Sequence, residues 1–195
     1  MTDPVELLAR ALRQTAGLID EVEPAQASLP TPCRSWDVAA LLDHVLADLP
    51  AFIEAAHGNR PDFSAKPPSV APNWAAEFRT RSDTLLRAWR DARDPAKLAA
   101  GQEPRRFQDM QVAELTVHAW DLASALDRSV DLDPELAEFS AEWMADALRA
   151  EYRGSEEEGK SFGFLVPVPA DASAYQRLAG IAGRDPAWTA RGMRN

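Results

Sequence analysis

The segment AELTVHAWDLA, residues 113–123, carries two carboxylates and an imidazole at helical spacing. On a helical wheel with about 100° per residue, Glu114, His118 and Asp121 fall within roughly 60° of one another. Imidazole and carboxylate groups are common ligands of divalent metal ions. The same spacing also produces an ordinary hydrogen-bonded pair on a helix, so the motif by itself leaves both interpretations open.

The residues on both sides of this polar stripe are apolar. They are Val112, Ala113, Leu115, Val117, Ala119, Trp120 and Leu122. A helix that is apolar almost all round is usually buried. Buried carboxylate and imidazole groups need partners, and a metal ion is one such partner.

Any further ligand must come from another part of the chain, which contains three histidines. His44 lies in the middle of a predicted helix, and Asp48 follows it one turn later on the same face. His57 stands beside Gly58 at the end of that helix, where a C-terminal cap is the expected role. His44 is therefore the candidate third ligand.

Together, His44, Glu114 and His118 would form a set of three protein ligands with an open coordination position. This arrangement is typical of a catalytic metal site, because a structural site uses four protein ligands. Zinc suits the donor set best, and nickel, iron or manganese also fit it.

The composition excludes several other classes of function. The net charge of −10 disfavours nucleic acid and anionic membranes as partners. No apolar run approaches the roughly 20 residues that span a bilayer, and the acidic, amphipathic N-terminus is unlike a signal peptide. The single cysteine, Cys33, excludes an internal disulfide. We therefore expect a cytoplasmic protein.

Helical periodicity predicts five main helices. Their expected ranges are 4–22, 36–58, 73–92, 108–126 and 134–148. Asp3 and Ser35 are the expected N-caps of the first two, and Pro50 should kink or locally disrupt the second.

The residues after the fifth helix differ in character. The segment FGFLVPVPADAS should be extended, and AYQRLAGIAG should form a short last helix. No internal repeat and no alternating strand pattern is present. We therefore predict one all-α domain over residues 1–195, a helical bundle on which an irregular extension, residues 152–195, is packed.

Two separated motifs resemble a known family. LPTPCRSWDVAALLDHVLADL followed by VAELTVHAWDLASAL resembles the N-terminal domain of mycothiol-dependent maleylpyruvate isomerases, within the wider DinB/YfiT-like superfamily. The tail VPVPADASAYQRLAGIAGRDPAW is similar to the ending of one actinobacterial subgroup. The resemblance implies a four-helix bundle with a crossover-type connection and a central divalent metal. His44, Glu114 and His118 match the metal ligands of the family.

The resemblance also implies a chemistry. Characterised relatives use the metal to activate the thiolate of mycothiol or a similar low-molecular-weight thiol, which isomerises an electrophilic substrate or is transferred to it. The isomerases carry a further C-terminal domain with a substrate-binding arginine, and residues 152–195 are too few to form it. We therefore expect an S-transferase or an isomerase of another substrate. A non-catalytic bundle that binds a small molecule or a partner, and a hydrolase using metal-bound water, are the alternatives.

Other residues complete the expected site. Asp121 would orient a metal ligand as part of the catalytic apparatus. Arg105 and Arg106 would hold a carboxylate of the thiol cofactor and of the substrate, respectively, unless their segment is a solvent-exposed loop. Trp36 and Trp120 could line the cofactor pocket. Tryptophans more often serve the core or a dimer contact, and a homodimer is left open. The resemblance makes Cys33 part of a packing turn, and the alternative is a nucleophile near a helix N-terminus.

Overall fold

The computed structural model describes residues 3–64, 68–92, 104–128, 132–155, 158, 160 and 162–190. The predicted all-α class is confirmed, because these residues form helices and only two isolated β-bridges. In chain order the helices are α1 (Pro4–Asp20), η1 (Pro24–Gln26), α2 (Val38–Ala56), α3 (Trp74–Asp91), α4 (Pro104–Ala125), α5 (Pro134–Ala147), η3 (Ala150–Tyr152) and α6 (Ala174–Ile181).

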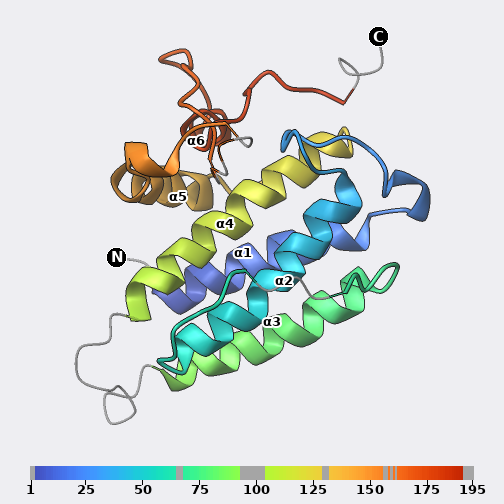
Figure 1. Cartoon of the computed structure of the whole chain (residues 1–195), viewed down its shortest axis with the longest axis vertical. Helices are drawn as coiled ribbons and strands as arrows, with labels where there is room; N and C mark the ends of the chain where they lie inside the picture. Colours follow the sequence, from blue (N-terminus) through green and yellow to red (C-terminus); the bar gives the residue numbers. More distant parts are fainter. Residues whose placement is uncertain are drawn as a thin grey trace.

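Helices α1 to α4 form the four-helix bundle (Figure 1). Each of α1 and α2 packs against both α3 and α4, so α1 and α2 lie diagonally across the bundle. The connection from α1 to α2 therefore crosses the bundle end, which is the crossover that the family resemblance implies. The apolar stripe of α1 is buried in the core as predicted, through Leu7, Leu8, Ala11, Leu12 and Leu18.

The N-caps of the first two long helices follow different rules. Asp3 caps α1, as its sequence predicts. The prediction for α2 is wrong, because Asp37 rather than Ser35 accepts the hydrogen bond from the backbone N–H three residues on. A turn in which the Trp36 N–H donates to the Cys33 carbonyl at 2.9 Å precedes the helix. This turn shifts the start of α2 two residues along the chain.

Helix α2 continues through Pro50 without a break. Proline has no N–H, so the carbonyl of Leu46 loses its ordinary partner within the helix. Arg81 of α3 donates to this carbonyl oxygen at 2.9 Å. The predicted disruption is thus limited to one hydrogen bond, which a neighbouring helix replaces.

Helix α4 begins at Pro104, four residues before its predicted start, and it ends at Ala125. Asp127 then adopts a left-handed φ of 52°. Its N–H donates to the Ser124 carbonyl, and the Arg128 N–H donates to the Ala123 carbonyl. These two bonds form a Schellman cap, whose left-handed position glycine favours.

The C-terminal extension packs on the outer side of the bundle. Helix α5 contacts α4 and α6, and α6 also contacts α4 (Figure 1). Residues 162–173 contain no helix, in agreement with the extended segment that was predicted. No helix within the described ranges is long and apolar enough to cross a membrane.

Candidate metal centre

The structure brings together the three predicted metal ligands. The nearest ligand atoms of His44, Glu114 and His118 all lie within 4.8 Å of one another. His118 Nε2 lies 3.4 Å from Glu114 Oε2. Ligand atoms around a tetrahedral ion at about 2.1 Å are roughly 3.4 Å apart, so small side-chain shifts would complete the site. The donor set and its spacing fit a divalent ion.

Two helices position these ligands. Glu114 and His118 lie one turn apart on α4, and His44 faces them from α2. The exposed fractions of the side chains are 6% for His118, 19% for Glu114 and 28% for His44. The cluster is therefore most deeply buried at His118 and most exposed to solvent at His44.

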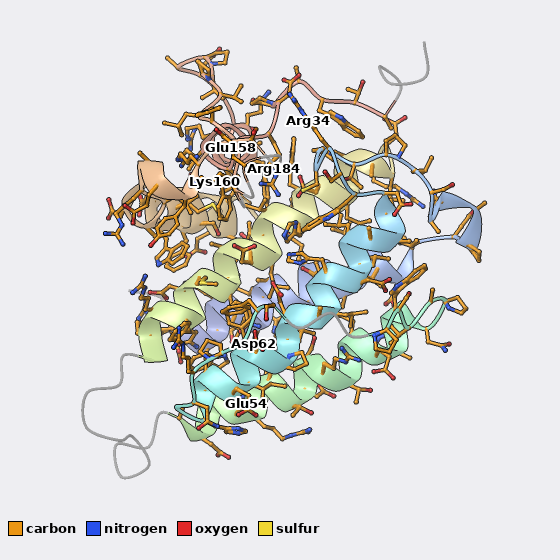
Figure 2. All side chains as sticks on the ribbon, in the orientation of Figure 1. Arg34, Glu54, Asp62, Glu158, Lys160 and Arg184 are labelled. Carbon is orange, nitrogen blue, oxygen red and sulfur yellow. The ribbon has the colours of Figure 1, made fainter. Side chains whose placement is uncertain are left out.

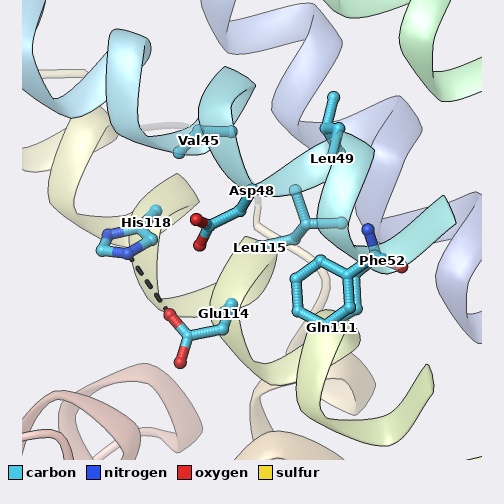
Figure 3. A pocket seen from close by; sticks show the side chains of 8 residues that line it. All are labelled: Val45, Asp48, Leu49, Phe52, Gln111, Glu114, Leu115 and His118. Atoms are coloured by element: carbon cyan, nitrogen blue, oxygen red, sulfur yellow. Dashed lines mark ion pairs between the residues drawn. The ribbon is translucent and has the colours of Figure 1, made fainter. Parts of the chain in front are cut away.

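Asp48 is a fourth acidic or basic group at the cluster. Its Oδ2 lies 3.5 Å from His44 Nε2, one turn further along α2. Figure 3 shows its carboxylate projecting from α2 toward His118 and Glu114 on α4. Burial, reinforced by the charge of Glu114, raises the pKa of Asp48 to about 7. The proximity of Asp48 to His44 in sequence indicated the shared face, but not that the carboxylate projects toward Glu114 and His118 on α4 (Figure 3).

A cavity of about 10 Å³ lies beside the cluster, which is room for roughly one water molecule. Its lining residues are Val45, Asp48, Leu49, Phe52, Gln111, Glu114, Leu115 and His118 (Figure 3). The amide oxygen of Gln111 accepts a hydrogen bond from Trp89, while its buried Nε2 has no partner among the described residues. Among the residues that the structure describes, no arginine or lysine belongs to this lining.

Asp121 forms a hydrogen bond with Nδ1 of the His118 ring, the nitrogen that does not face the cluster. Its Oδ2 lies 3.0 Å from His118 Nδ1, and its side chain is fully buried. A carboxylate in this position accepts the Nδ1 proton and leaves the Nε2 lone pair for a metal ion. The predicted orienting role of Asp121 requires this geometry.

Arg184 is a site residue that sequence reasoning missed. It follows α6 and is only 8% exposed. Its Nη2 lies 3.1 Å from Asp121 Oδ2, and its Nε lies 3.4 Å from Asp121 Oδ1. The same Nη2 lies 2.9 Å from the sulfur of Cys33. Burying an aspartate is costly unless a cation pairs with it, but this rule does not indicate which arginine of the chain does so.

Cys33, His118 and Asp121 form a second set of closely spaced donor atoms, also within 4.8 Å of one another. Two of these donors already contact the Arg184 guanidinium. On the Nδ1 side of His118, the Arg184 guanidinium is therefore already the cation that pairs with these donors. The fitting place for a metal ion is the Nε2 side, with His44 and Glu114.

The charges around His118 shift the pKa values of its neighbours. Burial opposes ionisation of Asp121, but Arg184 and His118 overcome it and lower the pKa of Asp121 to about 2. Burial, reinforced by the charge of His118, lowers the pKa of His44 to about 4. His44 is thus neutral at neutral pH and ready to coordinate an ion.

Two carboxylates outweigh the effect of burial on His118. Burial acts to lower the pKa of His118, whereas its contacts with Asp121, Cys33 and Glu114 raise it well above the ordinary value. For Glu114, burial acts to raise the pKa, and the neighbouring charges of His118, His44 and Arg184 lower it. In the metal-free protein, His118 is therefore an imidazolium, and its positive charge stabilises the Glu114 carboxylate as a bound metal cation would.

The two predicted pocket tryptophans lie in different places. The ring centroid of Trp36 is 4.3 Å from that of His44 and 5.8 Å from that of His118, so Trp36 covers the cluster. Trp120 is half-buried on α4. It follows His118 by two residues and therefore projects from a different side of the helix. Within the described ranges, its ring contacts neither site histidine.

The two predicted anion-binding arginines are not brought to the cluster. Arg105 and Arg106 are exposed in the first turn of α4 rather than in a preceding loop. Arg105 forms an ion pair with Asp109 at 2.6 Å. Both lie at least eight residues before Glu114, about 12 Å along the helix axis. The third histidine, His57, is the exposed C-cap of α2, as predicted.

A DinB-like helical bundle with a buried cluster of two histidines and a glutamate is the class that the fold and the site define. Within that class, the chain belongs to the family of the mycothiol maleylpyruvate isomerase N-terminal domain, whose family model matches residues 8–123. All three candidate ligands fall within this range.

The chain is also similar to two uncharacterized proteins of Mycobacterium tuberculosis, one from each of two strains. Each is 30% identical over 200 residues, a match that covers 93% of this chain and 98% of the relative. The similarity therefore includes the C-terminal extension, which lies outside the family match. No solved structure matches the chain.

Proposed function

We propose that the protein is a divalent-metal-dependent enzyme that uses a low-molecular-weight thiol of the mycothiol class and transfers it to an electrophilic substrate. The observation that carries this proposal is the cluster of His44, Glu114 and His118, in which Asp121 leaves the Nε2 of His118 directed at the other two ligands. Membership of a mycothiol-related family supports the choice of thiol.

The residues of the chain have distinct roles in this proposal. His44, Glu114 and His118 would hold the ion, zinc first and nickel, iron or manganese as alternatives. A divalent ion bound there lowers the pKa of a thiol at its open position. Asp48 accepts the thiol proton in this proposal, because its carboxylate lies beside His44 and projects toward the cluster (Figure 3). Trp36 shields one side of the cluster.

The charges at the cavity favour a neutral electrophile over an anionic one. The carboxylates of Asp48 and Glu114 face the cavity. A dicarboxylate such as maleylpyruvate would find no arginine or lysine among the described lining residues to pair with its charges, and Asp48 and Glu114 would already balance most of the charge of a bound divalent ion. Thiol transfer to a neutral acceptor is therefore the favoured reaction, in preference to isomerisation of a dicarboxylate.

The cellular setting that we propose follows from the same chemistry. A thiol-dependent reaction suits the cytoplasm, where thiols stay reduced. The partners are the small thiol and its electrophile. A net charge of −10 provides no basis for nucleic-acid binding.

Two histidine variants test this function. We expect about one zinc per chain by elemental analysis of the purified protein, and loss of the metal in His118→Ala. His57→Ala is the matched control, since this exposed histidine lies at the end of α2 and should leave the metal in place. Mycothiol is then titrated calorimetrically into metal-loaded protein, and its conjugation to the neutral electrophile monochlorobimane is followed by fluorescence.

The outcomes separate the alternatives. A protein that neither contains nor binds a divalent metal would overturn the proposal. Metal without mycothiol binding would favour a non-catalytic bundle. Ester or amide hydrolysis without any thiol, and without conjugation, would indicate a hydrolase that uses metal-bound water.

A further inference from the structure

Arg184 connects the C-terminal extension to the candidate metal cluster. Its guanidinium contacts both carboxylate oxygens of Asp121, which in turn contacts Nδ1 of His118. Arg184 and Asp121 are 63 residues apart in the sequence and are both buried. Figure 2 labels Arg184 on the side of the extension that faces α4. The extension thus reaches a metal ligand through two side chains.

The backbone of the extension is shaped to place this arginine. Gly183, with a φ of +80°, follows α6, and the Arg184 N–H donates to the Ala179 carbonyl at 2.8 Å, as in a Schellman cap. A Cβ atom on Gly183 would lie 2.6 Å from the Cα of Gly163, so two backbone segments cross in direct contact there. Arg153 donates to carbonyls on both crossing segments.

We infer that Arg184 is a positioning residue of the metal site and that the C-terminal extension is a working part of that site. The guanidinium balances Asp121 and holds its carboxylate in the orientation that accepts the Nδ1 proton of His118. The Nε2 lone pair is then left for the ion. This inference rests on the proposed metal binding.

The loss of the guanidinium would act on the ion through the His118 ring. Without it, the buried Asp121 carboxylate keeps the His118 imidazole and the Cys33 thiol as partners of Oδ2, while Oδ1 loses the guanidinium and the carboxylate has no fixed cation. The carboxylate must then turn or take up a proton. Either change removes the fixed acceptor of the Nδ1 proton, and outer partners of this kind typically contribute 10- to 100-fold to metal affinity.

The test compares three arginine variants of the full chain. Zn²⁺ affinity is measured by competition with a chromogenic chelator, and the visible spectrum of the Co²⁺-loaded protein reports ligand geometry. We expect Arg184→Met to weaken Zn²⁺ binding about 10- to 100-fold and to change the Co²⁺ spectrum. Arg184→Lys should recover part of the affinity, since an ammonium cannot form the two-pronged contact. Arg177→Met on α6 is the control and should change neither measurement.

A metal-free measurement keeps this inference separate from the proposed function. Ring ¹⁵N signals of His118 report whether Nδ1 keeps its hydrogen-bonded proton, and we expect Arg184→Met to disturb them. If the wild type bound no Zn²⁺, the proposed function would fail, and these signals would still decide whether Arg184 positions His118. Unchanged Zn²⁺ affinity together with unchanged ring signals in Arg184→Met would overturn the inference.

Undocking of α6 is monitored by amide hydrogen exchange. If Arg184→Met releases α6, the docked Arg184→Lys variant decides the matter. A weakened Zn²⁺ affinity in this variant supports the inference, and an unchanged affinity overturns it.

Discussion

Asp48, which is partly buried, and Asp121, which is fully buried, are aspartates of the same cluster, yet their pKa values move in opposite directions. The pKa of Asp48 rises to about 7, because burial and the nearby Glu114 oppose its charge. The pKa of Asp121 falls to about 2, because Arg184 and His118 outweigh its burial. Partners, rather than depth of burial, determine whether a buried carboxylate is ionised.

The comparison separates two sides of the His118 ring. On the completed side, at Nδ1, the charges of the side chains balance; on the incomplete side, at Nε2, they do not. On the Nδ1 side of His118, the charge of Asp121 is matched by Arg184. On the Nε2 side, Asp48 and Glu114 face one another with His118 as the nearest cation. Charge balance on the first side serves stability and orientation, whereas the second side lacks a positive charge that a divalent ion would supply.

The largest expected effect on stability follows from removing the Asp121 carboxylate on the completed side. Asp121→Ala leaves Arg184 buried and without a carboxylate partner, and it should lower the free energy of unfolding by about 3–5 kcal/mol. Urea denaturation of the metal-free protein measures this loss. Asp83→Ala, at an exposed aspartate of α3, is the control and should change stability little. Equal effects of the two substitutions would show that the Nδ1 side is not a charge-balanced cluster.

On the incomplete side, removing an aspartate charge should raise the free energy of unfolding, opposite to the effect of Asp121→Ala. The raised pKa of Asp48 means that its ionisation costs stability as pH rises from its ordinary value of 3.8 through about 7. Asp48→Asn should therefore stabilise the metal-free protein by about 1–3 kcal/mol at pH 8, allowing for partial solvent screening. The gain should vanish near pH 4. The same substitution should slow thiol transfer, since the proton acceptor is lost. Denaturation at both pH values, with conjugation assays, checks this trade of stability for function.

The pH dependence of metal binding should follow His118. An ion at Nε2 must displace its proton, so Zn²⁺ affinity should fall about tenfold per pH unit below the raised pKa of His118. His44, with a pKa of about 4, should add nothing between pH 6 and 8. Chelator competition at three pH values measures the slope.

The contribution of His118 to the stability of the metal-free protein should decrease as pH rises, whereas the Zn²⁺ affinity should increase. A folded-state pKa above the ordinary 6.5 gives stabilisation that is complete below pH 6.5 and disappears as pH rises through the folded pKa. A metal affinity that is independent of pH would argue against an ion at His118.

The smallest effect is expected at the end of α4, away from both clusters. Asp127 adopts a left-handed φ of 52°, which glycine tolerates better. Asp127→Gly should raise the free energy of unfolding by about 0.5–1 kcal/mol, after the entropic cost of glycine is included. Metal affinity should stay unchanged. A changed affinity would show that the end of α4 is coupled to the site and that the two-sided comparison is incomplete.

Local signals predicted most of the fold and the three candidate ligands. The long helices follow from apolar periodicity, and the cap at Asp3 from its residue type and the following proline. Glu114 and His118 could be paired because their spacing places them on one face of a helix. His44 was inferred by considering the three histidines of the chain, and the resemblance supported it, since no local pattern relates a residue of α2 to one of α4.

One local turn and two contacts between distant segments account for what the sequence did not predict. The start of α2 depends on the turn of residues 33–36, so Asp37 rather than Ser35 became the cap. The continuity of α2 at Pro50 depends on Arg81 from α3. Arg184 lies in a segment without periodicity, and its position depends on a backbone crossing at Gly183 that residue types do not indicate.

The distance in sequence between Asp121 and Arg184 has a consequence for biosynthesis. The chain is made from its N-terminus, so His44, Glu114 and His118 are all synthesised well before the arginine that balances Asp121. Until that arginine leaves the ribosome, the bundle contains a carboxylate that it cannot bury without cost. Stable closure of the bundle around the His118 ring should therefore wait until residue 184 has left the ribosome.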